Sequence, residues 1–514
     1  MDPKPGSAEE ETRFQELQQS LERHFCAVFP ERRTPRTVVV IPSLSIDAEI
    51  LASITGVQHY EERMLCMLML LRLPNTKVIY VTSEPIDPWV VDYFLSFLSG
   101  VPGRHARDRL TLLSCHDASA ATVTEKVLSR PRLLQRLRDA IDDPNAAHMT
   151  CFTATGLERT LAVQLGIPLY ACDPGLADLG SKSGSREMFR AADILMPAGS
   201  ERLRSEAQII DALAALKQQQ PSLRKAVIKL EEGAGGEGNA VLRFDGWTGQ
   251  QDLREWLRDE LPRGLEFVAP DEDWRNYLAK YERMGGIVEA WVDGDDKRSP
   301  SVQCRIDPAG NIATISTHDQ VLGGPSGQVF LGSTFPADEQ YRLSIQAAGE
   351  KVSVVLKERG VLGRYAIDFV SVKTAEGWQH YAIEINLRKG GTTHPFLTLM
   401  FLTDGSYDAT TGLFHTPVGE ARYYYASDNL KNPDYCRLTP HDLIDIAVEH
   451  NLHFHGASQQ GVVFHLIGAL SQYGKLGVLC VGDSPEAAYK LYQDTVVILD
   501  REALAEPSSP KRDQ

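Results

Sequence analysis

The chain has 514 residues, which is too long for one ordinary core and predicts roughly two to four domains. Apolar residues make up 43% and charged residues 24%, the balance of a soluble globular protein. The formal net charge of −16 argues against a nucleic-acid-binding surface, because a phosphate backbone attracts basic patches. The sequence contains no run of about twenty uncharged apolar residues, so no membrane-spanning helix is expected.

The N-terminus and the cysteines bear on the compartment in which the protein works. The opening MDPKPGSAEEETRF is acidic where a secretory signal would be basic and then apolar, so we expect a cytoplasmic protein. The eight cysteines contain no CxxC pair, which argues against both a disulfide framework and a structural zinc site. We therefore expect buried free thiols and no nucleic-acid or membrane partner, and a homo-oligomer stays open.

Residues 1–35 form a polar lead-in, with a helix expected from about Glu9 to Phe29. Over residues 36–178, apolar β-branched runs alternate with amphipathic segments. This order predicts an N-terminal parallel α/β domain, because parallel strands need helical crossovers between them. Strands are expected at 37–46, 77–83 and 109–114, and helices at 58–72, 87–99 and 121–142.

The order of expected elements changes over residues 179–404, where short strands follow one another with few helices between them. This pattern predicts an α+β domain with an antiparallel sheet, in which about residues 222–294 form a smaller lobe. We expect residues 405–505 to form a C-terminal domain packed on this one, and residues 506–514 to be disordered. Strands are expected at 285–294, 301–306, 311–317, 365–372 and 380–387, and helices at 249–261 and 337–359.

The strongest local signal is the glycine cluster in AVIKLEEGAGGEGNAVLRF, residues 226–244, between two expected strands. Gly235, Gly236 and Gly238 would let the chain fold over a ligand with its backbone N–H groups facing phosphate oxygens. Lys229, at the end of the incoming strand, could place its ammonium group on a phosphate. No GKS or GKT closes the loop and a strand follows it, which excludes a Walker loop and a dinucleotide fingerprint. An ordinary glycine-rich hairpin is the alternative.

Two further pairs of residues are candidates for contacts with a nucleotide. Lys182 and Arg186 lie four residues apart at the start of an expected helix, where both charges could face phosphates. In IVEAWVDG, residues 287–294, Glu289 lies on an apolar strand whose backbone could bind an adenine, and Asp293 could take ribose hydroxyls. The alternatives are a solvated helix start and an ordinary strand edge.

Acidic side chains inside two apolar strands predict a metal site. Asp368 lies in YAIDFVSV, and Glu384 and Asn386 lie two residues apart in HYAIEINL, so the last two share a face. Buried carboxylates are costly without a compensating cation, and oxygen ligands without sulfur suit Mg²⁺ shared with phosphates. Arg388, on the same face, could neutralise a transferring phosphoryl group. Polar groups that cap the strand ends are the alternative.

The segment GGTTHPF follows the predicted metal strand directly, so Thr392, Thr393 and His394 could line an acceptor pocket. A tight turn stiffened by Pro395 is an equal alternative. The HFH run at 453–455 has no evident third metal ligand, and we expect its histidines to be structural. The absence of a GxSxG motif gives no support to nucleophilic hydrolase chemistry.

The order of these residues along the chain resembles that of the ATP-grasp superfamily: Lys182, Lys229, the GAGGEG loop, Glu289, Asp368 and the pair Glu384 and Asn386. The match covers about residues 180–396, and SKSGSREMF, EINLRKGGTTHPF and GVVFHLIGALSQYGKLG are similar to the peptide ligases of the pheganomycin type. The resemblance implies two α+β lobes that hold ATP under a glycine-rich flap, with Mg²⁺ on the acidic strand residues. It also implies a ligase that joins a carboxylate to an amine through an acyl phosphate and releases ADP and phosphate.

In the implied mechanism the catalytic cations are Lys229, which with Lys182 neutralises phosphates, and Arg388, which stabilises the acyl phosphate or its tetrahedral successor. Two features depart from the superfamily. Ala366 stands where an arginine often precedes the first metal carboxylate, and no obvious second glutamate follows the adenine-binding strand. The substrates are expected to be small-molecule or peptide carboxylates and amines. The alternatives are a non-catalytic ATP-binding scaffold or regulatory protein of the same fold, and an enzyme that transfers the acyl group to a thiol.

Overall fold

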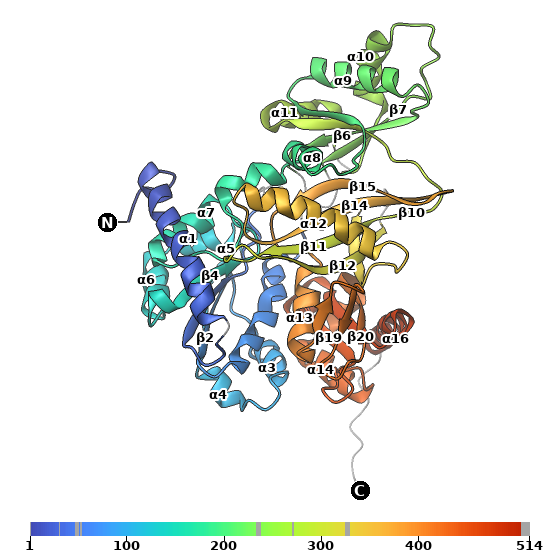
Figure 1. Ribbon diagram of the computed structural model, residues 1–514. Helices are drawn as coiled ribbons and strands as arrows, with labels where there is room; N and C mark the ends of the chain where they lie inside the picture. Colours follow the sequence, from blue (N-terminus) through green and yellow to red (C-terminus); the bar gives the residue numbers. More distant parts are fainter. Residues whose placement is uncertain are drawn as a thin grey trace.

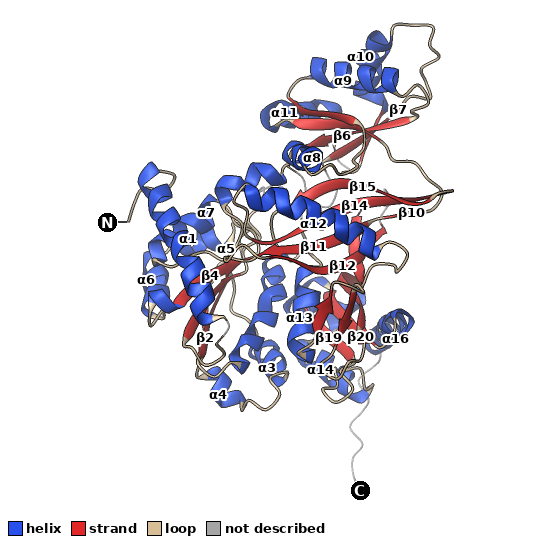
Figure 2. Cartoon of the chain, viewed as in Figure 1, coloured by secondary structure: helices blue, strands red, loops and turns tan. Residues whose placement is uncertain are grey.

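The computed structural model describes residues 2–29, 31–46, 51, 54–232, 238–269, 272–323 and 329–504. The N-terminal region, in blue and cyan, lies beside a body in yellow to red, and a lobe in green projects from both (Figure 1). Each of these three parts contains a sheet accompanied by helices (Figure 2).

The N-terminal region contains a four-stranded parallel sheet in the order β3-β2-β1-β4. Strand β1 is buried along its whole length, as expected for a parallel sheet covered by helices on both faces. Because the strands are parallel, the loops after β1 and β4 meet at one edge of the sheet. The elements are α1 (Ala8–Val28), β1 (Arg36–Ile41), η1 (Val57–Arg72), β2 (Thr76–Thr82), α3 (Pro88–Ser96), α4 (Gly103–Arg107), β3 (Leu110–Ser114), α5 (Val123–Leu128), α6 (Pro131–Asp139), η2 (Pro144–Ala146), β4 (Ala147–Cys151), α7 (Gly156–Leu165) and η3 (Pro174–Gly180).

The green lobe holds a five-stranded antiparallel sheet in the order β5-β9-β6-β7-β8. The buried apolar residues of this sheet form one core with those of three helices, including Tyr277 and Tyr281. Strand β6 pairs with both β7 and β9, so Lys229 and Glu289 lie on neighbouring strands. The elements are α8 (Lys182–Ala191), β5 (Gly199–Leu203), α9 (Glu206–Gln219), β6 (Lys225–Leu230), β7 (Asn239–Arg243), α10 (Leu253–Gly264), β8 (Leu265–Phe267), α11 (Trp274–Met284) and β9 (Gly286–Ala290).

The body is built on a nine-stranded antiparallel sheet in the order β10-β14-β11-β12-β13-β18-β20-β19, with β15 paired to β14. Helix α12 packs on β11 and β12, and α16 packs on β18 and β20. The elements are β10 (Lys297–Arg298), β11 (Pro300–Ile306), β12 (Ile312–Gly323), β13 (Val329–Phe335), α12 (Arg342–Glu358), β14 (Gly363–Thr374), β15 (Gly377–Asn386), α13 (Thr393–Thr403), the hairpin β16 (Ser406–Asp408) and β17 (Leu413–His415), β18 (Tyr423–Lys431), η4 (Pro433–Arg437), α14 (Pro440–Glu449), β19 (Gly461–His465), η5 (Ile467–Ala469), α15 (Leu470–Tyr473), β20 (Lys475–Gly482) and α16 (Pro485–Leu504).

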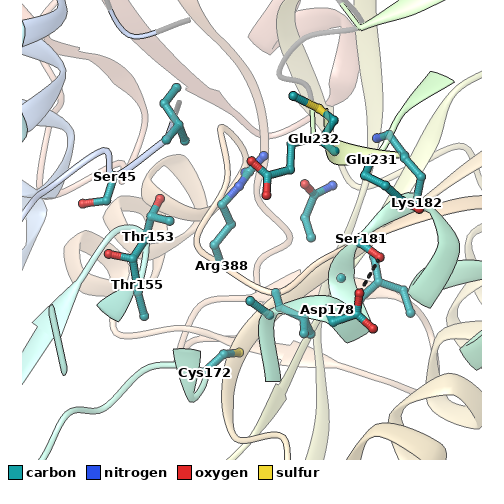
Figure 3. Close-up of a pocket in the computed structure, with 18 of the residues that line it drawn as sticks. Ser45, Thr153, Thr155, Cys172, Asp178, Ser181, Lys182, Glu231, Glu232 and Arg388 are labelled. Atoms are coloured by element: carbon teal, nitrogen blue, oxygen red, sulfur yellow. Dashed lines mark hydrogen bonds between the residues drawn. The ribbon is translucent and has the colours of Figure 1, made fainter. Parts of the chain in front are cut away.

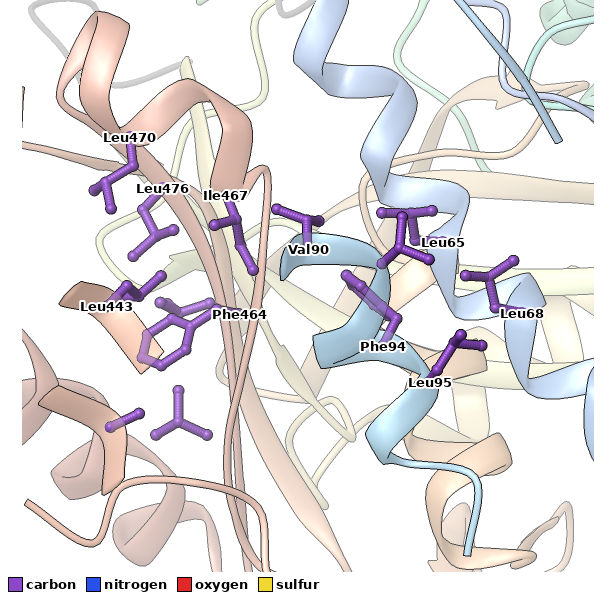
Figure 4. Close-up of a cluster of buried hydrophobic side chains, with 14 of the residues drawn as sticks. Leu65, Leu68, Val90, Phe94, Leu95, Leu443, Phe464, Ile467, Leu470 and Leu476 are labelled. Carbon is purple, nitrogen blue, oxygen red and sulfur yellow. The ribbon is translucent and has the colours of Figure 1, made fainter. Parts of the chain in front are cut away.

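The C-terminal region is joined to both of its neighbours. Its strands β18, β20 and β19 continue the large sheet beyond β13. A core cluster also links it to the N-terminal region, where Leu65 and Phe94 belong to the same buried group as Phe464 and Ile467 (Figure 4). Full burial of a leucine or phenylalanine side chain stabilises a protein by about 1.5–3 kcal/mol, so these contacts hold the two ends of the chain together.

The predicted fold class, a parallel α/β region followed by two α+β lobes, is confirmed. The prediction of one helix over 121–142 is wrong, since α5 ends at Leu128 and α6 begins at Pro131. Proline lacks the amide hydrogen required inside a helix but is well tolerated at its first position. The domain limits at 1–35, 36–178, 179–404 and 405–505 stay predictions.

Two further predictions concern composition. All eight cysteines are free thiols, as predicted; the prediction that they are buried is confirmed for six and is wrong for Cys26 and Cys436, which are exposed. None of the helices in the described ranges combines the length and apolar character needed to cross a bilayer.

Candidate active site

The two predicted metal carboxylates lie opposite each other on neighbouring strands. Asp368 on β14 pairs with Glu384 on β15, and Asn386 lies two residues further along β15. The Asn386 side-chain amide donates to Asp368 Oδ2 at 2.9 Å and to Glu384 Oε1 at 3.0 Å. Gln320 on β12 donates to the other Asp368 oxygen at 3.0 Å. Antiparallel pairing of β14 with β15 therefore brings together the three residues that the sequence placed in one metal site.

Lys182 faces these carboxylates from the first position of α8. Ser181 caps this helix by accepting a hydrogen bond from the Gly184 N–H, and Ser185 in its first turn accepts one from the Ile385 N–H of β15 at 2.9 Å. The Lys182 ammonium forms an ion pair with Glu384. Burial, together with the nearby charge of Lys229, lowers the pKa of Lys182 to about 7. Burial also raises the pKa of Asp368, and Lys182 opposes that rise. The pKa values of Lys182 and Asp368 therefore depend on each other's charge.

Glu289 holds the two remaining predicted phosphate-binding cations. It is almost fully buried on β9, where Lys229 of β6 forms an ion pair with it. Arg186 reaches the second Glu289 oxygen from α8 at 3.2 Å and also donates to the Pro197 carbonyl at 2.9 Å. A buried carboxylate shared by two cations fixes both side chains. Glu289 is therefore placed to position Lys229 and Arg186.

Arg388 follows β15 and points into a cavity of about 910 Å³. Burial lowers the pKa of its guanidinium, and the charge of Asp368 opposes this effect. Among the described residues Arg388 has no ion-pair partner, in contrast to Lys182 and Lys229. Figure 3 shows Arg388 between the threonines of the N-terminal region and the side chains around Lys182. Its charge is therefore available to a ligand in the cavity.

The cavity lies where the three parts of the protein meet. The N-terminal region contributes hydroxyl groups from the loops after β1 and β4, among them Ser45, Thr153 and Thr155. The Thr153 hydroxyl is buried and has no hydrogen-bond partner among the described residues. The small lobe contributes charged side chains, and the end of β15 completes the wall. These further lining residues are Asp178, Ser181, Lys182, Arg202, Arg204, Glu231, Glu232, Glu384, Asn386 and Arg388.

Several predicted residues lie outside this cavity. Asp293 is exposed between β9 and β10 and does not line it. Thr392, Thr393 and His394 are buried at the start of α13 and do not line it either, so their contact with an acceptor stays a prediction. The Gly238 carbonyl accepts hydrogen bonds from the Leu230 N–H and the Tyr277 hydroxyl, both at 3.0 Å, and is held at the start of β7. Gly235 and Gly236 lie outside the described residues.

The hydroxyl groups of Ser45, Thr153 and Thr155, which we call the hydroxyl wall, were not predicted, and neither was Gln320. Ser45 and Thr153 follow strands β1 and β4, and ligands of open parallel sheets bind at the carboxyl ends of the strands. That rule could have found Ser45, because β1 overlaps a predicted strand, whereas β4, with the sequence AHMTC, was not predicted as a strand. Nothing in the local sequence around Gln320 marks it as a neighbour of Asp368, since only the pairing of β12, β11 and β14 brings it there.

Known proteins share both the sequence and the fold. L-propargylglycine–L-glutamate ligase of Streptantibioticus cattleyicolor is 31% identical over 460 residues, which cover 88% of this chain and 92% of that protein. The family described as IQCH-like, ATP-grasp matches residues 174–245 and 250–410. The chain belongs to the ATP-grasp ligases. The match of residues 442–495 to the PGM1 C-terminal domain extends the similarity of this ATP-grasp ligase beyond its central lobes.

More distant proteins share part of the sequence or the fold. IQ motif-containing protein H of Danio rerio is 22% identical over 520 residues, and the match covers 91% of this ligase but only 49% of that protein. An ADP complex of N5-carboxyaminoimidazole ribonucleotide synthetase superposes with a TM-score of 0.51 at 14% identity, covering 91% and 98% of the two chains. The biotin carboxylase domain of Hydrogenobacter thermophilus 2-oxoglutarate carboxylase superposes with a TM-score of 0.53 at 13% identity, and the match covers 89% of each chain. These two structures share the fold.

The predicted activity class is confirmed by the family. ATP-grasp ligases use ATP to form a carbon–nitrogen bond, which supports the ligase over the non-catalytic alternative. The roles of individual residues in this ATP-grasp ligase stay predictions.

Proposed function

We propose that this ligase joins the carboxylate of one amino acid or short peptide to the amine of another while it splits ATP into ADP and phosphate. The observation that carries the proposal is the group of Asp368, Glu384 and Asn386 beside Lys182 at one end of a cavity. Two of these residues and Lys182 line that cavity, so a phosphate held by this group would face a substrate in it. The Streptantibioticus relative is named as a ligase of two amino acids, which supports substrates of this class.

The carboxylates fit Mg²⁺. Asp368 and Glu384 offer hard oxygen donors. The Asn386 amide donates to both carboxylates and the Lys182 ammonium pairs with Glu384, which supports the binding of a cation at this place. When bound there with ATP, Mg²⁺ would supply charge neutralisation for the transferring phosphoryl group. Asp368, Glu384 and the Asn386 side-chain oxygen would hold it.

The basic side chains around the site have different proposed roles. Lys182 and Lys229 bind the phosphates of ATP, and Glu289 keeps Lys229 and Arg186 in position on the small lobe. Arg388, which has no ion-pair partner among the described residues, binds the reacting carboxylate at the start and stabilises its phosphorylated form. With these assignments, positive side chains lie where negative charge develops during phosphoryl transfer.

The reaction then has two steps. An oxygen of the substrate carboxylate attacks the γ-phosphorus of ATP, the bond to the β-phosphate oxygen breaks, and ADP leaves. The amine of the second substrate attacks the acyl carbon, the carbonyl oxygen becomes negatively charged, and its collapse expels phosphate as the amine loses a proton to solvent. Arg388 lies where it can stabilise both charged species, and holding both substrates in one cavity replaces two separate encounters.

The hydroxyl wall is the proposed contact for polar groups of the substrates. The buried Thr153 hydroxyl has no hydrogen-bond partner among the described residues, and an unsatisfied buried hydroxyl costs about 1–3 kcal/mol. A substrate amide, ammonium or carboxylate that pairs with it would remove this cost. The predicted cytoplasmic location and the open question of a homo-oligomer stay predictions.

The proposal is tested by ADP release from ATP and Mg²⁺ in the presence of pooled L-amino acids and dipeptides. We expect release only when a carboxylate and an amine substrate are both present, with a product whose mass equals the two substrates minus water. Tight ATP binding without turnover over the whole pool would refute the proposal, and so would a product formed only with thiols.

A further inference from the structure

A second group of potential metal ligands lies in the body of the protein, outside the residues that line the cavity. His394 comes from α13, Asp428 from β18 and His465 from the end of β19, and all three are buried. His394 Nε2 lies 3.0 Å from Asp428 Oδ1, His465 Nε2 lies 2.6 Å from the same oxygen, and the two nitrogens are 3.1 Å apart. Three atoms with lone pairs therefore converge from three separate elements.

Protons cannot satisfy all three contacts of this triangle. If both imidazoles carry a proton on Nε2, both can donate to Asp428 Oδ1, but the two N–H groups then face each other across 3.1 Å. If one Nε2 is unprotonated, its lone pair faces the carboxylate lone pair. The His394 Nδ1 atom has no partner among the described residues with either tautomer, so it does not decide between these states. One cation in contact with the three atoms would remove the conflict.

The dimensions of the triangle suit a small transition-metal ion. Zinc binds histidine nitrogen at about 2.0–2.1 Å and carboxylate oxygen at about 2.0–2.2 Å, so two ligands at a tetrahedral angle lie roughly 3.3 Å apart. The observed separations of 2.6, 3.0 and 3.1 Å need an opening of only a few tenths of an ångström on most sides. Two imidazoles and one carboxylate favour zinc or a neighbouring first-row metal over Mg²⁺, which prefers oxygen ligands.

Burial and charge affect the pKa values of two of these side chains, His394 and Asp428. Burial lowers the pKa of His394 to about 4, so its imidazole is neutral at pH 7. Burial alone would raise the pKa of Asp428, but its contacts with His394 and His465 hold it below its usual range. Metal binding requires neutral imidazole and ionised carboxylate.

Arg63 is the competing cation, and it binds the other side of the carboxylate. Its guanidinium lies 3.4 Å from Asp428 Oδ2, while both histidines contact Oδ1. The same guanidinium lies over the rings of Tyr60 and Phe152, with 4.6 and 4.2 Å to the ring centroids. Arg63 therefore orients the carboxylate and leaves Oδ1 free to bind an ion, as outer partners of metal-bound carboxylates do.

We propose that His394, Asp428 and His465 bind one divalent transition-metal ion, Zn²⁺ by the chemistry of the ligands. The ion would tie α13, which follows the strand carrying Glu384, to β18 and β19 of the C-terminal region. This site is separate from the oxygen ligands Asp368, Glu384 and Asn386, and its role is to fix the position of α13.

The test is calorimetric titration of the chelator-treated full-length protein with Zn²⁺ in the presence of excess Mg²⁺. We expect one tightly bound equivalent. His465→Gln should lower the affinity by about 100-fold or more, because removing a ligand should exceed the roughly 10–100-fold effect of removing an outer partner. His455→Gln, which alters an exposed histidine, and Glu384→Gln, which alters the oxygen site, should bind Zn²⁺ as the wild type does.

Two results would overturn the proposal: a wild-type protein that binds no Zn²⁺, or equal Zn²⁺ affinity for wild type and His465→Gln. If His465→Gln fails to fold, the visible absorption of Co²⁺ added to the wild type decides instead. We expect the strong bands of a low-coordinate site with nitrogen ligands. A weak octahedral spectrum would contradict the assignment.

Discussion

Asp368 and Glu384 are paired directly across β14 and β15, and a single amide group donates hydrogen bonds to both carboxylates. Two acidic side chains held this close in a partly buried place repel each other unless positive charge lies nearby. Lys182 supplies part of that charge in the absence of ligands. The ion pair between Lys182 and Glu384 therefore links the start of α8 to β15 of the large sheet.

The first prediction concerns Glu384→Gln. We expect ligase turnover to fall by at least about 100-fold, because a bound metal ion contributes several kcal/mol to stabilising the transferring phosphoryl group. The fold should be kept, since Gln has the same shape and Asn386 remains. Glu376→Gln, at the exposed turn between the same two strands, is the matched control and should retain turnover. Equal activity of the two variants in the ADP-release assay would rule out the assignment of Glu384.

The second prediction concerns Glu289, which lies buried between Lys229 and Arg186. Glu289→Gln leaves buried Lys229 without its ion-pair partner and Arg186 with Glu201 alone, and breaking a buried ion pair costs about 3–5 kcal/mol. Urea unfolding should therefore show a marked loss of stability. Glu266→Gln breaks the exposed pair with Arg243 in the same sheet and should cost less than about 1 kcal/mol. Similar unfolding midpoints for the two variants would show that Glu289 is not a structural partner of both cations.

The third prediction separates binding from stability at the hydroxyl wall. Thr153→Val removes a buried hydroxyl that has no partner among the described residues, so the unliganded protein should be no less stable. If that hydroxyl binds substrate, KM for one substrate should rise about 2- to 10-fold, the equivalent of one hydrogen bond. Thr124 donates instead to the buried Glu158 at 2.5 Å and does not line the cavity. Thr124→Val should cost about 1.5–3 kcal/mol of stability with KM unchanged. An unchanged KM in Thr153→Val would remove Thr153 from the substrate site.

The fourth prediction is a pH dependence of stability caused by Glu61. This buried carboxyl accepts hydrogen bonds from the Ser83 N–H and hydroxyl, both at 2.6 Å, and burial raises its pKa from 4.5 to about 7. The folded protein thus holds the proton more tightly than the unfolded chain. The stabilisation is complete below pH 4.5 and is lost as pH rises to about 7, a change of about 3 kcal/mol.

Glu61→Gln has no proton to lose, so the comparison with wild type isolates this effect. We expect the wild type to lose unfolding free energy relative to Glu61→Gln between pH 5 and pH 8. The measurement is urea unfolding of both proteins across that range. A difference that stays constant with pH would show that the pKa of Glu61 is not raised.

Local sequence was sufficient for the parts of the site that lie on regular strands. Glu384 and Asn386 had to share a face because side chains alternate along a strand, and Asp368 was recognisable as an acid within an apolar run. Lys229 was found because it ends a strand before a glycine cluster. The structure places these residues around one site, although Lys229 is held by Glu289, a partner 60 residues away.

Two other features, the cluster of His394, Asp428 and His465 and the joining of the C-terminal region to the large sheet, depend on contacts between distant parts of the chain. His394, Asp428 and His465 lie 34 and 37 residues apart, without the short spacing that marks a metal motif. Only the pairing of β18 and β19 with β20, and the packing of α13 against them, brings the three together. Likewise, a C-terminal region that joins the large sheet through β13 and β18 cannot be told from a separate domain by its composition.

In the proposed function, the protein activates a carboxylate by transferring the γ-phosphoryl group of ATP to it at the Glu384 site. The most direct measurement uses a substrate whose carboxylate is labelled with ¹⁸O, followed by mass spectrometry of the released phosphate. We expect one labelled oxygen per turnover to move into inorganic phosphate, with ADP as the other product, and we expect Glu384→Gln to abolish this transfer. Label found in AMP, or unlabelled phosphate released during product formation, would contradict it.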